Sequence, residues 1–164
     1  MIEDLNVTYQ EGKICQICEV VFNLEETVEK YYNTLGFGSW YFWDFIPPNL
    51  YDYYYKGVKV NAGFRIAVAQ VGPIQYELTQ PLFGMSIHRD FLDKNGEGIH
   101  HVKIYYKDIE KALKEFAKKN IYVLQEGKYK SDWHVYLDTQ KEFGIIWELG
   151  NCMDIGNPDK KFPI

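Results

Sequence analysis

Residues 16–37 read QICEVVFNLEETVEKYYNTLGF, and residues 101–122 read HVKIYYKDIEKALKEFAKKNIY. The two stretches superpose at a constant offset of 85 without a gap, which is the signature of an internal repeat. Each begins with a run rich in β-branched and aromatic residues, as strands do. Each continues with an N-cap candidate, Asn23 or Asp108, and then with apolar residues at helical spacing. The repeat therefore predicts two modules that both open with a strand and a helix.

The helical spacing also predicts which side chains face the core. We expect these to be Leu24, Val28, Tyr31, Tyr32 and Leu35 in the first helix, and Ile109, Ala112, Leu113, Phe116 and Ala117 in the second.

The module ends repeat as well. Residues 73–78 and 143–149 both place an apolar strand before a Glu-Leu pair, here at an offset of 71, so the second module is shorter by 14 residues. The extra stretch, residues 42–59, contains Pro47, Pro48 and the aromatic run Tyr51–Tyr55, and we expect a loop or an extended hairpin there. The remaining strands are expected near residues 40–46, 60–71, 73–80, 121–126, 132–138 and 143–150.

The predicted fold class is α+β, with two βαβββ modules that form paired, curved, mixed sheets around a metal or ligand cavity. A four-stranded sheet has to curl or pair in order to bury its face. Pro81 is expected to end the strand that carries Glu77, and Ser86 to cap a short helix. The predicted boundaries are 1–84 for the first module, 85–98 for a connecting helix and turn, 99–151 for the second module, and 152–164 for a loosely ordered tail.

Composition excludes several classes of partner. The formal net charge is −5, which argues against nucleic acid and against anionic membrane surfaces. Aromatic residues make up 17% of the chain, which suits a cavity for a small-molecule substrate or the interface of a homodimer. The start is acidic, no apolar run approaches the ~18 residues of a membrane helix, and three cysteines are an odd number. We therefore expect a cytoplasmic protein without a signal peptide.

The repeat singles out four positions for chemistry. Gln16 and His101 are equivalent at the start of the first strand of each module, and Glu77 and Glu148 are equivalent near the end of the last strand. A pseudo-two-fold arrangement of the modules would bring the four side chains to one point. Two carboxylates, an imidazole and an amide oxygen suit one divalent metal ion such as Zn²⁺, Ni²⁺, Co²⁺, Mn²⁺ or Fe²⁺.

The paired βαβββ pattern resembles the vicinal oxygen chelate superfamily, which includes lactoylglutathione lyase, methylmalonyl-CoA epimerase, extradiol dioxygenases and bleomycin-resistance proteins. The most specific string is Gly96-Glu97-Gly98-Ile99-His100-His101-Val102, which is similar to the signature of epimerase-like members. Supporting strings are Leu35–Trp40, Glu77–Pro81, Tyr136–Thr139 and Trp147–Leu149, and the resemblance covers residues 13–150.

By this resemblance the metal ligands fall on Gln16, Glu77, His101 and Glu148. Glutamine at the first position departs from the epimerase pattern, which has histidine there, and is similar to the set of eukaryotic-type lactoylglutathione lyase. The implied function is a metal-dependent isomerase or lyase that removes a proton next to a carbonyl or thioester, with Glu148 as first choice of base and Glu77 as second. The alternative is a metal-free protein that sequesters small molecules such as drugs.

Other reactive or charged side chains are interpreted mainly as structural. His100 is expected to point away from His101, and His134 to line the cavity at most. Cys15 and Cys18 are spaced C-x-x-C on a strand, where residues three apart face opposite sides, so neither a zinc site nor a redox site is expected. The run Tyr51–Tyr55 is either an interface or packed loop, or an aromatic wall for an apolar substrate. The basic run Lys111, Lys114, Lys118 and Lys119 is expected to be a solvated helix face, with contact to a coenzyme A phosphate as the alternative.

Overall fold

The computed structural model describes residue 5 and residues 9–163, so the acidic start of the chain lies outside the described residues. Within them, the predicted βαβββ repeat is confirmed. The first module consists of β1 (Ile14–Val20), α1 (Leu24–Leu35), β2 (Trp40–Phe45), β5 (Gly63–Val71) and β6 (Ile74–Phe83). The second consists of β7 (Gly98–Tyr105), α3 (Ile109–Ala117), β8 (Val123–Tyr129), β9 (Asp132–Leu137), the short α4 (Gln140–Phe143) and β10 (Ile146–Gly150).

Both predicted helix caps form. The side chain of Asn23 accepts a hydrogen bond from the backbone N–H of Glu26 (3.2 Å), and that of Asp108 from the backbone N–H of Lys111 (2.9 Å). The predicted core faces are confirmed in the first turns, but Leu35 is 58% exposed and Ala117 is also exposed. Both residues lie at the end of their helix, where the last turn extends beyond the surface that the sheet covers.

Tyr32 is a second correction to the predicted core of α1. It is 38% exposed, and its ring packs edge-on against Phe162 near the chain end rather than against the core.

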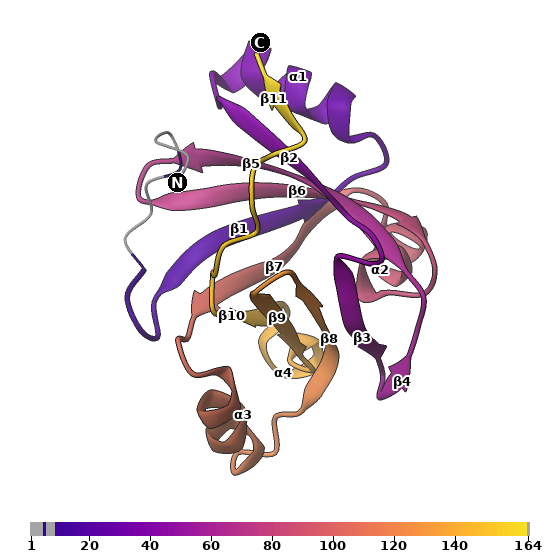
Figure 1. The fold of residues 1–164 in the computed structure, drawn as a ribbon, viewed down its shortest axis with the longest axis vertical. Helices are drawn as coiled ribbons and strands as arrows, with labels where there is room; N and C mark the ends of the chain where they lie inside the picture. The colour runs from indigo at the N-terminus through magenta and orange to yellow at the C-terminus, as the bar shows by residue number, and fades with distance from the viewer. Residues whose placement is uncertain (1–4, 6–8, 164) are drawn as a thin grey trace.

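The modules share one continuous sheet rather than the two paired sheets that the sequence predicts. Its strand order is β11-β2-β5-β6-β1-β7-β10-β9-β8-β3-β4, where β3 is Leu50–Tyr55, β4 is Val58–Lys59 and β11 is Lys160–Phe162. The join is the antiparallel pair β1–β7, which links the first strands of the two modules edge to edge. Figure 1 shows this sheet curling from the upper strands to the lower ones. The centre of the sheet is therefore where the two modules meet.

The aromatic stretch between β2 and β5 is an extended hairpin. It consists of β3 (Leu50–Tyr55) and β4 (Val58–Lys59), and β3 pairs with β8 of the second module. Tyr53 and Tyr55 are buried and Tyr54 between them is only partly buried, whereas Tyr51, which lies beyond a register shift, is exposed. Residues of the first module thus complete the sheet of the second, which supports the packed-segment interpretation of this run.

Of the two predictions for the segment that joins the modules, one is confirmed and one is wrong. Ser86 caps α2 (Ile87–Asn95) as predicted. Pro81 does not end β6, which continues to Phe83. Pro81 pairs there with Phe64 beside a register shift, and such an irregular position tolerates a residue without a backbone N–H.

The tail is ordered rather than loose. It crosses the open face of the sheet and ends in β11 (Lys160–Phe162), which pairs antiparallel with β2 (Figure 1). On the way, Lys130 Nζ donates to the Ile155 carbonyl (2.8 Å) and Trp43 Nε1 to the Gly156 carbonyl (3.1 Å). We call residues 152–157 the strap.

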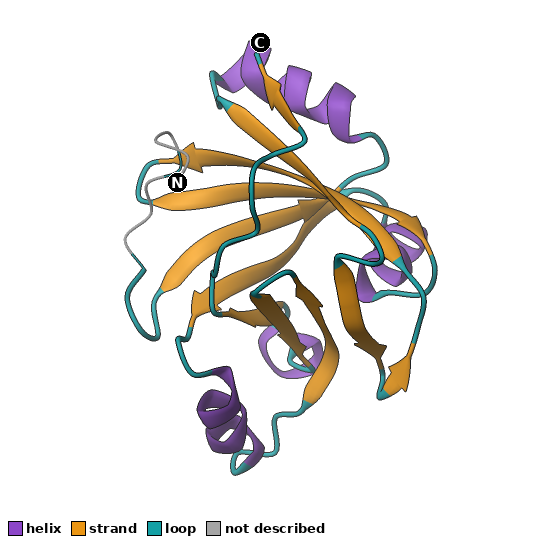
Figure 2. Ribbon diagram, in the orientation of Figure 1, coloured by secondary structure: helices purple, strands orange, loops and turns teal. Residues whose placement is uncertain are grey.

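The two faces of the sheet have different cores. In β2, Trp40 and Phe42 pack toward α1, whereas Tyr41, Trp43 and Phe45 pack on the opposite, inner face. Figure 2 shows that the helices, in purple, lie around the outside of the curled sheet. Among the described residues, no helix has the length and apolarity needed to cross a bilayer. With the described helices on the outside, the inner face of the sheet is left open to a ligand.

Candidate functional site

The site lies where the two modules join, on the inner face of four adjacent strands. Cys18 of β1 is in register with Glu77 of β6 on one side and with His101 of β7 on the other. These three residues form one row across the sheet.

A second row lies two residues away along these strands, on the same face. In it, Gln16 of β1 stands opposite Gln75 of β6 and Lys103 of β7, and Lys103 stands opposite Glu148 of β10. Because strand side chains alternate with period two, both rows present their side chains to the same space.

All four predicted ligand residues are buried in this space. His101 Nε2 lies 3.0 Å from Glu148 Oε2 and 3.9 Å from Glu77 Oε1. The Gln16 amide nitrogen donates to Gln75 Oε1 (3.3 Å), and Thr79 Oγ1 donates to Glu77 Oε1 (2.8 Å). The structure therefore brings together the residues that the repeat singled out.

Several of these buried atoms have no hydrogen-bonding partner. Among the described residues this holds for Gln16 Oε1, His101 Nε2 and Glu148 Oε2, whereas Glu148 Oε1 forms an ion pair with Lys103 Nζ (2.9 Å). His101 Nε2 and Glu148 Oε2 are close, yet they are not aligned as donor and acceptor. Buried polar atoms without partners are costly, and a common cation would satisfy these.

The separations and charges also suit a cation. Donor atoms about 2.0–2.2 Å from one ion lie roughly 3–4 Å from each other, which is the range found here. The acidic side chains of Glu77, Glu148 and Asp132 outnumber the single cation Lys103 around the site. A divalent ion would balance the remaining negative charge. The residues present thus fit a metal with nitrogen and oxygen ligands.

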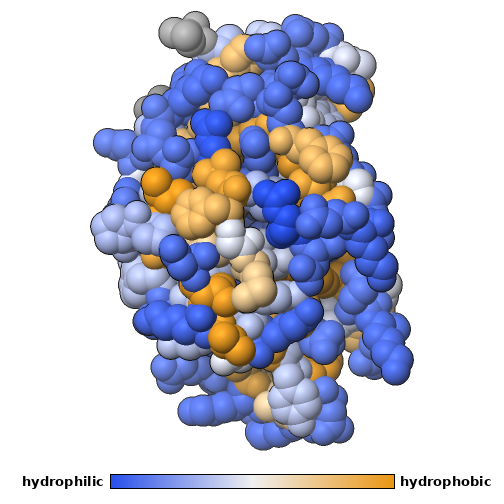
Figure 3. Space-filling model, turned by 90° about the vertical axis from the view of Figure 1, so that its right-hand side faces the viewer, coloured by the Kyte–Doolittle hydropathy of each residue, from blue (hydrophilic) through white to orange (hydrophobic). Residues whose placement is uncertain are grey.

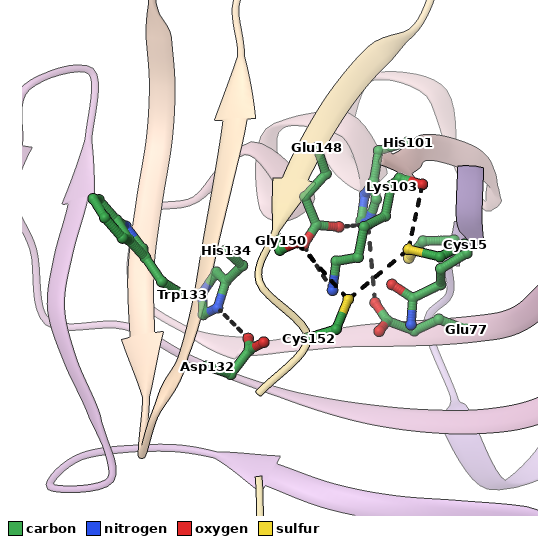
Figure 4. Close-up of polar contacts among 12 residues, drawn as sticks. Cys15, Glu77, His101, Lys103, Asp132, Trp133, His134, Glu148, Gly150 and Cys152 are labelled. Atoms are coloured by element: carbon green, nitrogen blue, oxygen red, sulfur yellow. Dashed lines mark hydrogen bonds and ion pairs between the residues drawn. The ribbon is translucent and has the colours of Figure 1, made fainter. Parts of the chain in front are cut away.

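Lys103 is a site residue that the sequence interpretation missed. Its ammonium lies 2.9 Å from Glu148 Oε1, and Figure 4 shows it reaching between Glu148 and Cys152. A side chain on Gly150 would collide with Lys103, whose Cε would lie 2.9 Å from an added Cβ. Lys103 follows His101 by two residues on one strand, and this spacing was the signal that places it on the same face.

Lys103 and Glu148 each shift the pKa of the other toward the charged form. Burial alone would lower the pKa of Lys103, but Glu148 and Asp132 outweigh it and raise that pKa well above its usual value. Burial likewise would raise the pKa of Glu148, but the Lys103 ammonium is the strongest opposing influence, and the pKa falls to about 2. Lys103 is therefore a fixed cation and Glu148 a fixed anion at neutral pH.

The prediction that His100 points away from the site is wrong. The register of β1 and β7 shifts between Cys18–His101 and Glu19–Ile99, which leaves His100 as the extra residue of a bulge. Its Nδ1 lies 2.8 Å from His101 Nδ1, so the two rings are hydrogen-bonded. Burial lowers the pKa of His100 well below its usual value, so its ring is neutral.

The other two histidines pack beside this pair. His88 of α2 is buried with its ring centroid 5.1 Å from that of His100 and 5.7 Å from that of His101. His134 is buried among aromatic rings, with its Nδ1 3.4 Å from Asp132 Oδ2. Asp132 is the member of that pair which lines the pocket. The sequence offers no pattern that would have predicted this cluster.

The cysteines form no C-x-x-C site among the described residues. Cys18 is fully buried beside Thr79 (Sγ to Oγ1 3.3 Å) and lies within metal-ligand range of Glu77 and His101. Cys15 instead faces the strap, with its Sγ 3.9 Å from that of Cys152 (Figure 4). Cys15 and Cys18 thus have different neighbours, the strap for Cys15 and the site for Cys18.

The site opens into a pocket of about 830 Å³ on the inner face. Gln16, Glu77 and Lys103 line its polar part, Trp43, Ile66 and Val68 its apolar wall, and the strap its cover. A molecule in this pocket would reach Glu77 and Lys103 directly.

The sequence matches the model of one protein family. A family model described as the glyoxalase/bleomycin resistance protein/dioxygenase superfamily matches residues 15–137. Gln16, Glu77 and His101 lie within the matched region and Glu148 lies beyond it. No curated protein matches the chain.

Solved structures share the fold at low sequence identity. A hypothetical protein from Bacillus halodurans is 21% identical, with a TM-score of 0.70, over 90% of this chain and 99% of that one. Methylmalonyl-CoA epimerase from Mycobacterium tuberculosis is 18% identical, with a TM-score of 0.61, over 88% and 91%. A variant of methylmalonyl-CoA epimerase from Streptomyces coelicolor, in complex with 2-nitronate-propionyl-CoA, is 21% identical, with a TM-score of 0.63, over 91% and 100%.

Proposed function

We propose, from the premise that this chain belongs to the glyoxalase/bleomycin resistance protein/dioxygenase superfamily, that it is a metal-dependent isomerase or lyase. The reaction is removal of a proton next to a carbonyl or thioester. One observation carries the proposal: Gln16 Oε1, His101 Nε2 and Glu148 Oε2 are buried without hydrogen-bonding partners among the described residues, beside Glu77 and next to a pocket.

Gln16, Glu77, His101 and Glu148 are the residues that would hold the metal. When bound, a divalent ion supplies Lewis acidity that stabilises negative charge on a substrate oxygen. Glu148 would use Oε2 toward the ion, because Lys103 already holds Oε1. Such an outer contact orients a ligating carboxylate.

Glu77 is the better placed base of the two carboxylates. It lines the pocket, and Thr79 orients its Oε1, which leaves Oε2 to accept a proton. Both oxygens of Glu148 face cationic or imidazole nitrogens instead. We therefore reverse the order suggested by the sequence and assign proton removal to Glu77, with Glu148 holding the metal.

The substrate class follows from the pocket and the resemblance. The apolar wall formed by Trp43, Ile66 and Val68 accepts a hydrocarbon or thioester portion, and the polar end presents Glu77 and Lys103. Epimerase-like activity is supported by the GEGIHH string and by the epimerases among the structural neighbours. Glyoxalase-like activity is supported by the Gln, Glu, His, Glu set.

Homodimerisation and a cytoplasmic location are part of the proposal. Leu82, Phe83 and Met85 are exposed next to α2, and Figure 3 shows apolar patches in orange on the side that carries this helix. The free cysteines are in keeping with a reducing compartment. Light scattering of the purified protein tests the dimer.

Elemental analysis tests the metal. We expect about one divalent ion per chain after purification without chelator, and its loss in His101→Ala and Glu148→Gln, whereas His134→Ala should keep it. Methylmalonyl-CoA and hemithioacetal substrates are then assayed in D₂O for exchange of the activated proton. A wild-type protein that takes up no Ni²⁺, Co²⁺, Mn²⁺ or Zn²⁺ would instead point to the metal-free binding protein.

A further inference from the structure

Two neighbouring histidines of β7 meet at their ring nitrogens, which neighbours on a regular strand do not do. On a regular strand the side chains of His100 and His101 would point to opposite faces. The bulge at His100 turns its ring toward the site, and the two Nδ1 atoms come within 2.8 Å. Both rings are buried, so no solvent competes for this contact.

A hydrogen bond between two imidazole nitrogens needs an N–H on one ring and a lone pair on the other. If His101 donates, its proton is on Nδ1 and its Nε2 carries a free lone pair. If His100 donates, the proton of His101 is on Nε2, where the nearest acceptor is Glu148 Oε2 at 3.0 Å. Those two atoms are not aligned for a hydrogen bond, which favours the first arrangement.

We propose that His100 is a positioning residue that accepts a hydrogen bond from Nδ1–H of His101 and so keeps His101 Nε2 unprotonated for a metal ion. This inference rests on the proposed metal site. A metal-binding histidine needs the other ring nitrogen to be held by an acceptor, and here a second histidine takes the place that a carboxylate or carbonyl often fills.

The support continues outward from His100. Because its Nδ1 accepts from His101, its own proton is on Nε2. The backbone of Ile87 is a further hydrogen-bonding neighbour of the ring. Ile87 opens α2, and its N–H donates to Oε1 of the buried Gln125 on β8 (2.9 Å). The tautomer of His101 is thus tied to α2 and β8 through His100.

Binding of Co²⁺ alone, measured with three variants, tests the role. His100→Leu removes the acceptor, His100→Asn keeps one near the Nδ1 position, and His88→Leu is the matched control. His88 is equally buried and packs against both rings, but it has no hydrogen-bonding partner among the described residues. We expect His100→Leu to weaken Co²⁺ binding about 10–100-fold, while His100→Asn and His88→Leu stay within about threefold of wild type.

A long-range ¹H–¹⁵N spectrum of the metal-free protein gives the tautomer directly. We expect His101 to carry its proton on Nδ1 in the wild type and in His100→Asn, and on Nε2 in a larger fraction of His100→Leu. Unchanged Co²⁺ affinity in His100→Leu, or an equal loss in His88→Leu, would overturn the positioning role. Undiminished Co²⁺ binding in His101→Ala would overturn the proposed metal site instead, and the tautomer measurement would still decide the role of His100.

Discussion

The Lys103 ammonium lies 2.9 Å from Glu148 Oε1 at the centre of the sheet, where the Glu148 side chain is buried and the Lys103 side chain is 11% exposed. The pair places an internal cation beside a carboxylate that we assign to metal binding. Glu148 therefore has different neighbours at its two oxygens, Lys103 at one and His101 at the other. Lys103 therefore neutralises part of the negative charge of the site. Several consequences of this arrangement can be measured.

Replacing Lys103 by Met should destabilise the metal-free protein. The change leaves the Glu148 carboxylate buried without its cation, and the expected loss of unfolding free energy is about 3–5 kcal/mol. Urea unfolding measures it, and added Ni²⁺ should restore part of the loss. The control Lys118→Met removes an exposed pair with Glu115 and should change little. Wild-type stability in Lys103→Met would contradict the assigned pairing.

The stability of the metal-free protein should fall in acid because of Glu148. The folded pKa of Glu148, about 2, lies below its ordinary value of 4.5, so its contribution is full above pH 4.5 and is lost as the pH falls toward 2. The contribution is on the order of 3 kcal/mol. Urea unfolding between pH 5 and pH 2 should show the advantage of wild type over Glu148→Gln shrinking across this window. Parallel curves for the two proteins would refute the lowered pKa.

Replacing Glu77 by Gln should separate chemistry from metal binding. The amide keeps an oxygen that can bind a metal but cannot accept the substrate proton. We expect proton exchange into substrate to fall about 10²–10⁴-fold. Co²⁺ affinity should fall much less than in His101→Ala. NMR in D₂O measures the exchange, and full exchange activity in Glu77→Gln would return the role of base to Glu148.

Replacing Gly127 by Ala should destabilise the hairpin that completes the second sheet. An added Cβ would lie 2.5 Å from the Tyr53 ring and 2.7 Å from His134 Nε2. Overpacking of this kind costs about 1–3 kcal/mol in thermal or urea unfolding. The control Gly98→Ala adds a Cβ whose nearest neighbour is 3.9 Å away and should be tolerated. Equal stability of the two variants would mean that β3 does not pack against β8 as described.

The sequence by itself determined the modules and the face that carries the site. The repeat at an offset of 85 and the strand period of two depend only on local spacing, and local spacing fixes which side chains share a face. That is why Gln16, Glu77, His101 and Glu148 were found before their distances were known.

Tertiary structure alone decided how the strands pair and which groups neutralise the site. The β1–β7 join, the pairing of β3 with β8 and the return of β11 to β2 link residues far apart in the chain, and local periodicity carries no information about such partners. The bulge at His100 and the charge pair of Lys103 and Glu148 likewise arise only when β1, β7 and β10 lie side by side. Register between strands is set by packing across the whole sheet, and it is this register that turns four predicted residues into one site.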